Sequence, residues 1–226
     1  MGLRSFGFAA LCACLLAGVA PAATLSFQGT FTQDDQLQLF TFTAPTASFE
    51  VRTWSYAGGT DTNPNSIAAG GFDPVLSVFD VTQGGSPLKG TNDNGVNICP
   101  AGAPACVSAD PSTGLALDSL LQLSSLNVGD TYVLVLSQAD NVPNGNTLGA
   151  GFSEVGNPNF TTSFGCGGTG FCDGFGNQRN ANWAVDIMNV GGASEVGGAA
   201  PEPGTMLLLS AGLAGLAVLR TRRKQT

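Results

Sequence analysis

Asp and Asn side chains gather beside apolar stretches in the middle of the chain, and their oxygens are the ligands that calcium prefers. The candidate calcium ligands are Asp73, Asp80, Asn92, Asp93 and Asp118, with Asn94 next to them. Their order does not fit an EF-hand, which needs oxygen ligands at alternate positions and a closing Glu. Asp and Asn also cap turns by hydrogen bonding to their own backbone, so turn capping is the alternative interpretation.

The residue types needed for most enzyme chemistry are missing or scattered. The sequence contains no histidine, which excludes Ser-His-Asp and Cys-His catalytic sets and the usual zinc sites. A glycan hydrolase would need two carboxylates at a fixed separation, with one of them kept protonated. The Asp residues are concentrated in turns, and Glu50, Glu154 and Glu195 are isolated. We therefore predict no catalytic residues, with a carboxylate-dependent glycan hydrolase as the alternative class.

The charge balance argues against nucleic acid as a partner. Residues 23–200 contain fifteen acidic side chains and only Arg52, Lys89 and Arg179 as basic ones, a net charge near −12. Phosphate backbones are bound by Lys and Arg, which are scarce here. The same stretch is rich in Gly and Phe and is long enough for one well-packed domain made mainly of strands and turns.

Four cysteines lie outside the apolar N-terminal segment, and they form two close pairs. They are Cys99, Cys106, Cys166 and Cys172. An even number of cysteines in an exported protein indicates disulfides, and pairing within each close pair is the simplest of the three connectivities. Neither spacing is the two-residue spacing of zinc knuckles, so metal binding is the weaker alternative.

Alternating apolar and polar residues predict the strands that would position these side chains. The predicted strands span residues 24–32, 36–43, 48–56, 75–81, 89–91, 118–123, 131–138 and 182–190. Residues 33–35 and 127–130 look like the turns of two hairpins. The strand at 75–81 alternates too little to face water, so we expect it to be buried on both faces. These features predict an all-β fold, an antiparallel β-sandwich of jelly-roll type over residues 23–190.

Both ends of the chain carry the features of targeting signals. An apolar run and small residues before position 22 predict a signal peptide over residues 1–22, cut by signal peptidase. At the other end, an apolar segment at 205–219 and a basic tail predict a transmembrane helix whose tail stays in the cytoplasm. Residues 191–200 are Gly-rich and predict a flexible spacer before this segment.

The C-terminal segment, residues 201–226, resembles the PEP-CTERM sorting signal of Gram-negative bacteria. The resemblance rests on Pro201, Glu202 and Pro203, followed by the apolar segment and the basic cluster in the same order. It implies recognition and cleavage by an exosortase, a membrane-embedded protease of bacteria that make exopolysaccharide. A plain membrane anchor that is never cut is the alternative.

The middle of the chain resembles the bacterial pre-peptidase C-terminal domain. The resemblance rests on residues 72–80, on residues 92–95, on Asp118 and Ser119, and on the strand that follows Gly129. The family usually has two Asp in the turn where this chain has Asp93 between two Asn. The resemblance implies a small β-sandwich that often accompanies an exported enzyme.

These features together predict an exported protein that is tethered to the inner membrane as a precursor and then placed at the cell surface or in the extracellular matrix. The predicted role is a non-catalytic structural or binding module associated with exopolysaccharide and processed by exosortase. The alternative is a calcium-dependent carbohydrate-binding module or an accessory domain of a glycan-active hydrolase. The Phe-rich loop at residues 160–175 could stack on sugar rings, but a minor apolar core is the favoured interpretation.

Overall fold

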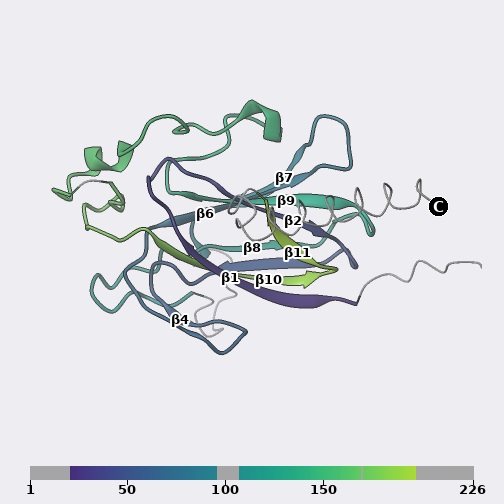
Figure 1. Cartoon of the computed structure of the whole chain (residues 1–226), viewed down its shortest axis with the longest axis horizontal. Helices are drawn as coiled ribbons and strands as arrows, with labels where there is room; N and C mark the ends of the chain where they lie inside the picture. The colour runs from purple at the N-terminus through teal and green to yellow at the C-terminus, as the bar shows by residue number, and fades with distance from the viewer. Residues whose placement is uncertain (1–20, 96–106, 169, 197–226) are drawn as a thin grey trace, which may run out of the picture.

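The computed structural model describes residues 21–95, 107–168 and 170–196, which form two antiparallel sheets packed face to face (Figure 1). The four-stranded sheet has the order β1 (Ala23–Thr30), β10 (Asn182–Val190), β3 (Phe49–Thr53) and β8 (Leu120–Leu123). The five-stranded sheet has the order β11 (Ala193–Val196), β2 (Gln38–Thr43), β9 (Thr131–Gln138), β6 (Pro74–Asp80) and β7 (Leu88–Asn92). The predicted all-β antiparallel sandwich is therefore confirmed.

Alternate residues of the strands point into the space between the two sheets. In β3 the side chains of Phe49, Val51 and Thr53 are buried, whereas Glu50 and Arg52 are partly exposed. This is the pattern expected of a strand that covers a core with one face only. The resulting core contains residues of both sheets and is rich in aromatic rings, which bury large apolar areas.

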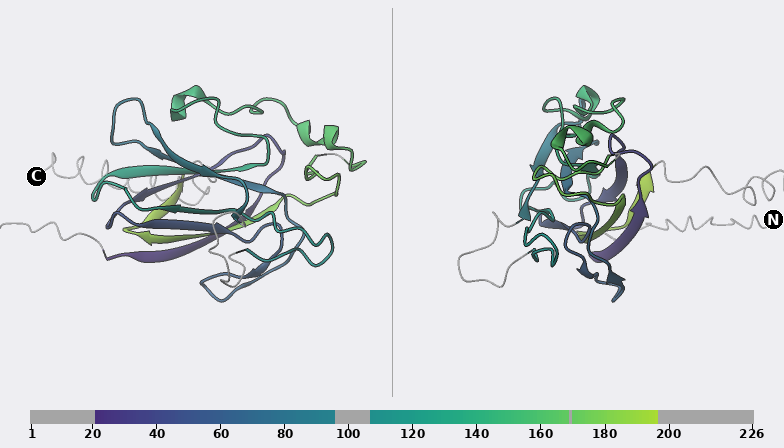
Figure 2. Two further views of the ribbon diagram at one scale, coloured as in Figure 1. Left: turned by 180° about the vertical axis from the view of Figure 1, so that it is seen from behind. Right: turned by 90° about the vertical axis from the view of Figure 1, so that its left-hand side faces the viewer.

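A second, smaller apolar cluster lies on the outer side of the five-stranded sheet. It combines Phe79 of β6 with Val133 and Val135 of β9, and Phe152 packs on them from the connection between β9 and β10. This connection, green in Figure 2, runs along one side of the sandwich. All seven residues of β6 are buried, which confirms the predicted strand with two covered faces.

The two predicted hairpins are wrong. The first predicted pair became β1 and β2, which lie in different sheets, with β1 paired to β10 and β2 to β9 and β11. The second pair became β8 and β9, and β8 pairs with β3 in the opposite sheet. Both connections therefore cross from one sheet to the other. In the first crossing Asp34 is buried and accepts hydrogen bonds from the backbone N–H groups of Asn159 and Thr161, which hold the turn away from a hairpin path.

The last strand lies where a flexible spacer was predicted. Ala193–Val196 forms β11, which pairs antiparallel with residues 39–42 of β2 at the edge of the five-stranded sheet. The spacer prediction is wrong for these four residues, which contain no glycine and pair their backbone with an existing strand. The backbone N–H of Gly191 donates to the carbonyl of Thr43 and closes the tight connection from β10.

Other parts of the chain add little to the sandwich. A two-stranded ribbon of β4 (Gly59–Thr60) and β5 (Ser66–Ile67) and two short 3-10 helices, Leu148–Ala150 and Phe160–Phe164, lie in the long connections. No helix in the described part of the chain is long and apolar enough to cross a membrane. The predicted signal peptide up to residue 20, the transmembrane segment at 205–219 and the Cys99 and Cys106 pair lie outside the described residues.

Candidate functional site

Asp118 lies directly before β8 and its carboxylate caps the turn that follows β3. The carboxylate accepts hydrogen bonds from the Thr53 hydroxyl at 2.8 Å and from the backbone N–H groups of Tyr56 at 3.0 Å and Ala57 at 2.8 Å. Burial raises the pKa of Asp118, and these hydrogen bonds oppose the rise because they favour the charged form. Both oxygens are thus occupied by turn capping.

Asp80 and Asn92 also hold turns in place. Asp80 ends β6, and its oxygens accept hydrogen bonds from the backbone of Thr82 and the side chain of Gln83 at 3.2 and 2.9 Å. The Oδ1 atom of Asn92, at the end of β7, accepts a hydrogen bond from the backbone of Leu120 at 3.0 Å. Asp80 and Asp73 are separated by the whole length of β6, so the structure does not bring all five predicted ligands together.

Asp73 differs from these capping residues because its Oδ1 atom is buried without a hydrogen-bond partner in the part of the chain that the structure describes. Burial raises the pKa of Asp73 well above its usual range, and repulsion from nearby carboxylates adds to the rise, with Asp93 the strongest. Partial desolvation also raises the pKa of Asp93, with a further contribution from Asp140. Within the described ranges, no group of three or more Asp, Glu or Cys side chains is close enough to hold a metal ion.

A groove opens beside Asp93 on the outer side of the five-stranded sheet. It has a volume of about 530 Å³ and lies between β6, β7 and the connection after β9. One wall carries Asp93 and Asn94, which follow β7, and the other carries Asn144 and Asn146. Asp93 of the first wall was predicted as a calcium ligand, whereas no residue of the second wall was predicted, since Asn residues in a long loop look like ordinary turn formers.

The connection that contains the second cysteine pair is fastened to the sandwich by a buried cation. Arg179 donates from Nε to the carbonyl of Gly71 at 3.0 Å and from Nη2 to the carbonyl of Tyr56 at 2.7 Å. The same Nη2 lies 3.1 Å from a carboxylate oxygen of Asp110 in a buried ion pair. Burial opposes ionisation of Asp110, but hydrogen bonds from Arg179, Ser112 and Thr113 together hold its pKa below the usual range. This buried pair was not predicted from the sequence.

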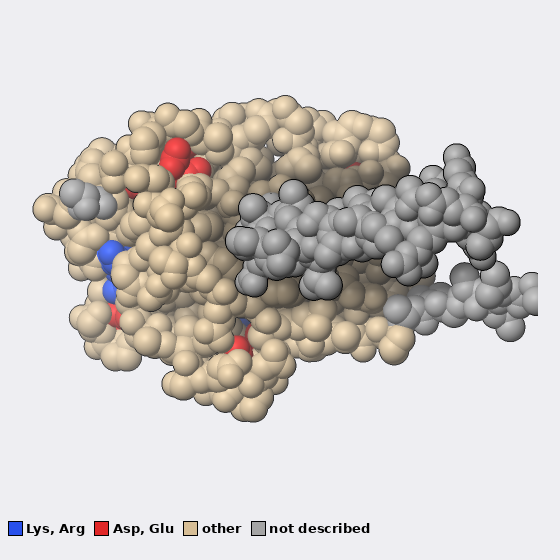
Figure 3. All heavy atoms as spheres, in the orientation of Figure 1, with Lys and Arg blue, Asp and Glu red and all other residues tan. Residues whose placement is uncertain are grey.

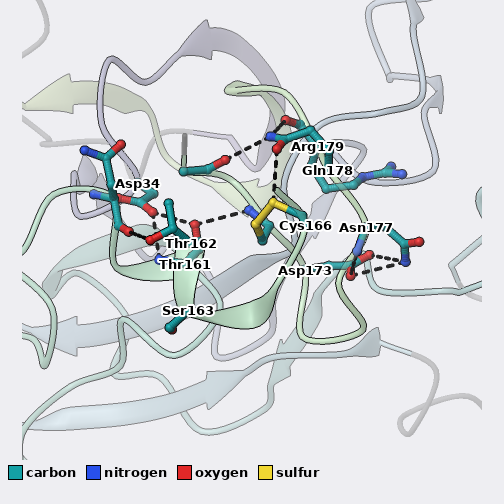
Figure 4. The surroundings of a disulfide bond; sticks show 12 residues. Asp34, Thr161, Thr162, Ser163, Cys166, Asp173, Asn177, Gln178 and Arg179 are labelled. Carbon is teal, nitrogen blue, oxygen red and sulfur yellow. Dashed lines mark hydrogen bonds between the residues drawn. A yellow bond between two sulfur atoms is a disulfide. The ribbon is translucent and has the colours of Figure 1, made fainter. Parts of the chain in front are cut away.

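The second cysteine pair forms the local disulfide that its spacing predicted. Cys166 and Cys172 are bonded, with their Cα atoms 5.7 Å apart (Figure 4). Beside the disulfide, Thr161 donates its hydroxyl to Asp34 and accepts the backbone N–H of Cys172. This chain of contacts joins the disulfide loop to the crossing between β1 and β2.

Of the four Phe residues of the predicted Phe-rich loop, only Phe171 belongs to an apolar core in the described part of the chain, so the predicted core role is confirmed for that ring alone. Phe171 belongs to the main core and packs on Phe72 with ring centroids 5.8 Å apart. Phe160 and Phe164 pack edge to face on each other. Phe160 and Phe164 are partly buried, and Phe175 is the exposed ring of this group, at 68 %.

The decisive comparison concerns the C-terminal segment, whose residues lie outside the described ranges. Residues 199–224 match the PEP-CTERM protein-sorting motif. The PEP-CTERM motif contains Pro201, Glu202 and Pro203, the predicted processing residues, and it marks an exported, membrane-anchored precursor that is processed by an exosortase. No curated protein matches this chain. The resemblance of residues 72–136 to the pre-peptidase C-terminal domain stays a prediction.

Proposed function

We propose that this PEP-CTERM protein is placed at the cell surface or in the extracellular matrix of a Gram-negative bacterium, where its β-sandwich acts as a non-catalytic module associated with exopolysaccharide. The single observation that carries the proposal is the match of residues 199–224 to the sorting motif, which routes the sandwich out of the cell. The absence of histidine from the sequence and the engagement of Asp118 and Asp80 in turn capping favour binding over catalysis.

The surface of the sandwich supports association with a neutral, hydrated polymer. Only 11 % of the residues are charged, and the face in Figure 3 shows few Lys, Arg, Asp or Glu side chains. The surface is instead rich in Asn, Thr, Ser and Gly, whose amide and hydroxyl groups can exchange hydrogen bonds with sugar hydroxyls. The net charge of residues 23–200 is negative, near −12, so an acidic polymer would be repelled.

The experiment follows the epitope-tagged full chain in a host with an active exosortase and in the same host without it. We expect the protein to leave the inner membrane and sediment with exopolysaccharide only in the first host. The double variant Glu202→Ala with Pro203→Ala should stay in the inner membrane, whereas the control Asp130→Ala, in the turn before β9, should be processed normally. Release of the double variant at the normal rate would refute the sorting part, and release without polysaccharide association would refute the binding part.

Calcium binding is a second candidate, favoured by the buried Oδ1 atom of Asp73 that has no partner in the described chain. A cation between Asp73 and Asp93 would offset the repulsion that raises the pKa of both. No group of three or more acidic or Cys side chains is close enough to hold a metal ion among the described residues, so backbone carbonyls or water would have to complete the coordination. A melting temperature that rises with millimolar calcium, and does so less in Asp73→Asn, would support this candidate. An unchanged melting temperature would dismiss it.

A further inference from the structure

The groove between β7 and the connection after β9 has polar side chains whose hydrogen-bonding capacity is not used within the protein. The Oδ1 atom of Asn94 is buried and has no partner in the described chain. Asn144 makes only a long side-chain contact, 3.5 Å to the carbonyl of Ala150. The side chains of Asp93 and Asn146 are exposed and make no hydrogen bond within the described ranges. The exposed side chains of Asp93, Asn144 and Asn146 are therefore available to hydrogen bond a ligand that enters the groove.

The backbone that carries these side chains is held firmly. The carbonyl of Asn146 accepts the backbone N–H of Leu88 in β7 at 2.9 Å, and the backbone N–H of Asn144 donates to Gly151 at 3.0 Å. On the other wall, Asn92 positions Asn94 through a side-chain contact to its carbonyl at 3.4 Å and is itself fixed by Leu120. The backbone of both walls is therefore pre-formed, and binding has to order only the side chains, which lowers the entropic cost for a ligand.

The rest of the groove is apolar and open to solvent. Val75, Leu88, Val142 and Pro143 line it, and Val142 is 41 % exposed. A volume of about 530 Å³ lies within the usual range of small-molecule sites, about 300–1,000 Å³. A surface with apolar patches between amide and carboxylate groups matches a sugar ring, which has apolar C–H faces and a rim of hydroxyls.

The negative charges around the groove favour a neutral glycan over an acidic one. Asp93 lies in the groove and Asp140 close by, so the local potential is negative and an acidic polysaccharide would be repelled. A carboxylate is a strong acceptor for hydroxyl donors, so a neutral sugar gains from the same charge. The other polar cavity, next to Trp183, is a weaker candidate, because Gln28 and Asn182 there already hydrogen bond to Asp61 and Thr30.

We propose that this groove, lined by Asp93, Asn94, Asn144 and Asn146, binds a short stretch of neutral, hydroxyl-rich glycan. The inference deepens the proposed function and rests on it, because it names the surface through which the sandwich would hold exopolysaccharide. An open groove that holds an uncharged ligand without an ion pair would give weak binding per site, which suits a polymer that offers many equivalent stretches of glycan.

The test uses the full-length protein purified in detergent and run by affinity electrophoresis through gels that contain one polysaccharide each. The neutral probes are dextran, galactomannan and a mixed-linkage β-glucan, and the acidic probes are alginate and hyaluronan. We expect retardation by at least one neutral probe, and at least a tenfold loss of affinity in the double variant Asn144→Ala with Asn146→Ala. Asn157→Ala is the matched control, because Asn157 is an exposed Asn of the same connection that bonds Glu154 and lies outside the groove. This control should bind as the wild type does.

Three results would overturn the inference. Wild-type affinity in the double variant would show that neutral glycan binds elsewhere. Retardation by alginate or hyaluronan alone, and only with calcium, would show that the carboxylates bind a bridging cation instead. No retardation by any probe, in a protein that still sediments with its own host's exopolysaccharide, would overturn this site while leaving the proposed function standing. The proposed function itself fails only in the host experiment, so the two failures are distinguishable.

Discussion

Replacement of Asp118 by Ala tests whether the predicted calcium ligands act as turn caps. The substitution removes the acceptor for the backbone N–H groups of Tyr56 and Ala57 and for the hydroxyl of Thr53. A buried donor left unpaired costs about 1–3 kcal/mol, so the two N–H groups alone predict a loss of about 2–6 kcal/mol in the free energy of unfolding. For a domain of this size each kcal/mol corresponds to about 2–4 °C, so we expect the melting temperature to fall by roughly 10 °C.

The assay is thermal unfolding followed by circular dichroism, in EDTA and in millimolar calcium. Asp130→Ala is the control, because within the described residues the Asp130 carboxylate accepts a hydrogen bond only from the side chain of Asn127, at 3.0 Å, and its loss should cost less than about 1 kcal/mol. The loss in Asp118→Ala should be the same in both buffers, since the hydrogen bonds need no cation. A variant that melts within about 2 °C of the wild type would refute the capping argument. A loss that is seen only with calcium would reassign Asp118 to a metal site.

Three further predictions concern charges and cross-links in the same domain. The pKa of Asp73 is raised on folding, so the stability contributed by its protonated form is complete below about pH 4 and is lost as the pH rises. In EDTA, Asp73→Asn should therefore melt at a higher temperature than the wild type at pH 7 but not at pH 4. Parallel profiles of melting temperature against pH for the two proteins would contradict this. Arg179→Lys keeps the charge but loses the planar set of donors to Gly71 and Tyr56, so urea titration should show a loss of about 3 kcal/mol in the free energy of unfolding. The control Lys89→Arg, whose partly exposed Lys pairs with Asp80, should leave the free energy of unfolding unchanged. Replacing Cys166 and Cys172 by Ser removes the constraint that the disulfide places on the unfolded chain, so the same titration should show a loss of about 2 kcal/mol in the free energy of unfolding. An unchanged urea midpoint would show that the disulfide adds no such stability.

The strands themselves were predictable because their residues alternate or are continuously apolar. Phe49 to Thr53 shows the period of a strand with one buried face, and β6 shows the unbroken apolar character of a strand with two. What the pattern does not contain is the partner of each strand. The crossing after β1 depends on Asp34, whose carboxylate bonds residues more than a hundred positions away, and no local pattern reports such a contact.

The candidate groove was only half predictable for a related reason. Asp93 and Asn94 stand out because they interrupt a strand-rich stretch with oxygen-bearing side chains. Asn144 and Asn146 lie in a long loop where Asn is common, and the backbone bonds from this loop to Ser86 and Leu88 bring them across the sheet. The buried pair of Arg179 and Asp110 was equally hidden, since its two members are 69 residues apart in the sequence.

The position of β11 bears on how the sorting signal can be reached. Only residues 197–200 separate Val196 from Pro201, and a fully extended chain covers about 3.5 Å per residue, so the processing site lies within roughly 18 Å of the sandwich. β11 is a short edge strand with three of its four residues exposed, so its detachment from β2 would expose little core and would add roughly 13 Å of reach. We therefore expect exosortase processing to be limited by fraying of this strand. Insertion of a Gly-Ser linker after Val196 should speed release from the membrane in a pulse-chase assay, and an unchanged rate would mean that the protease works directly against the folded sandwich.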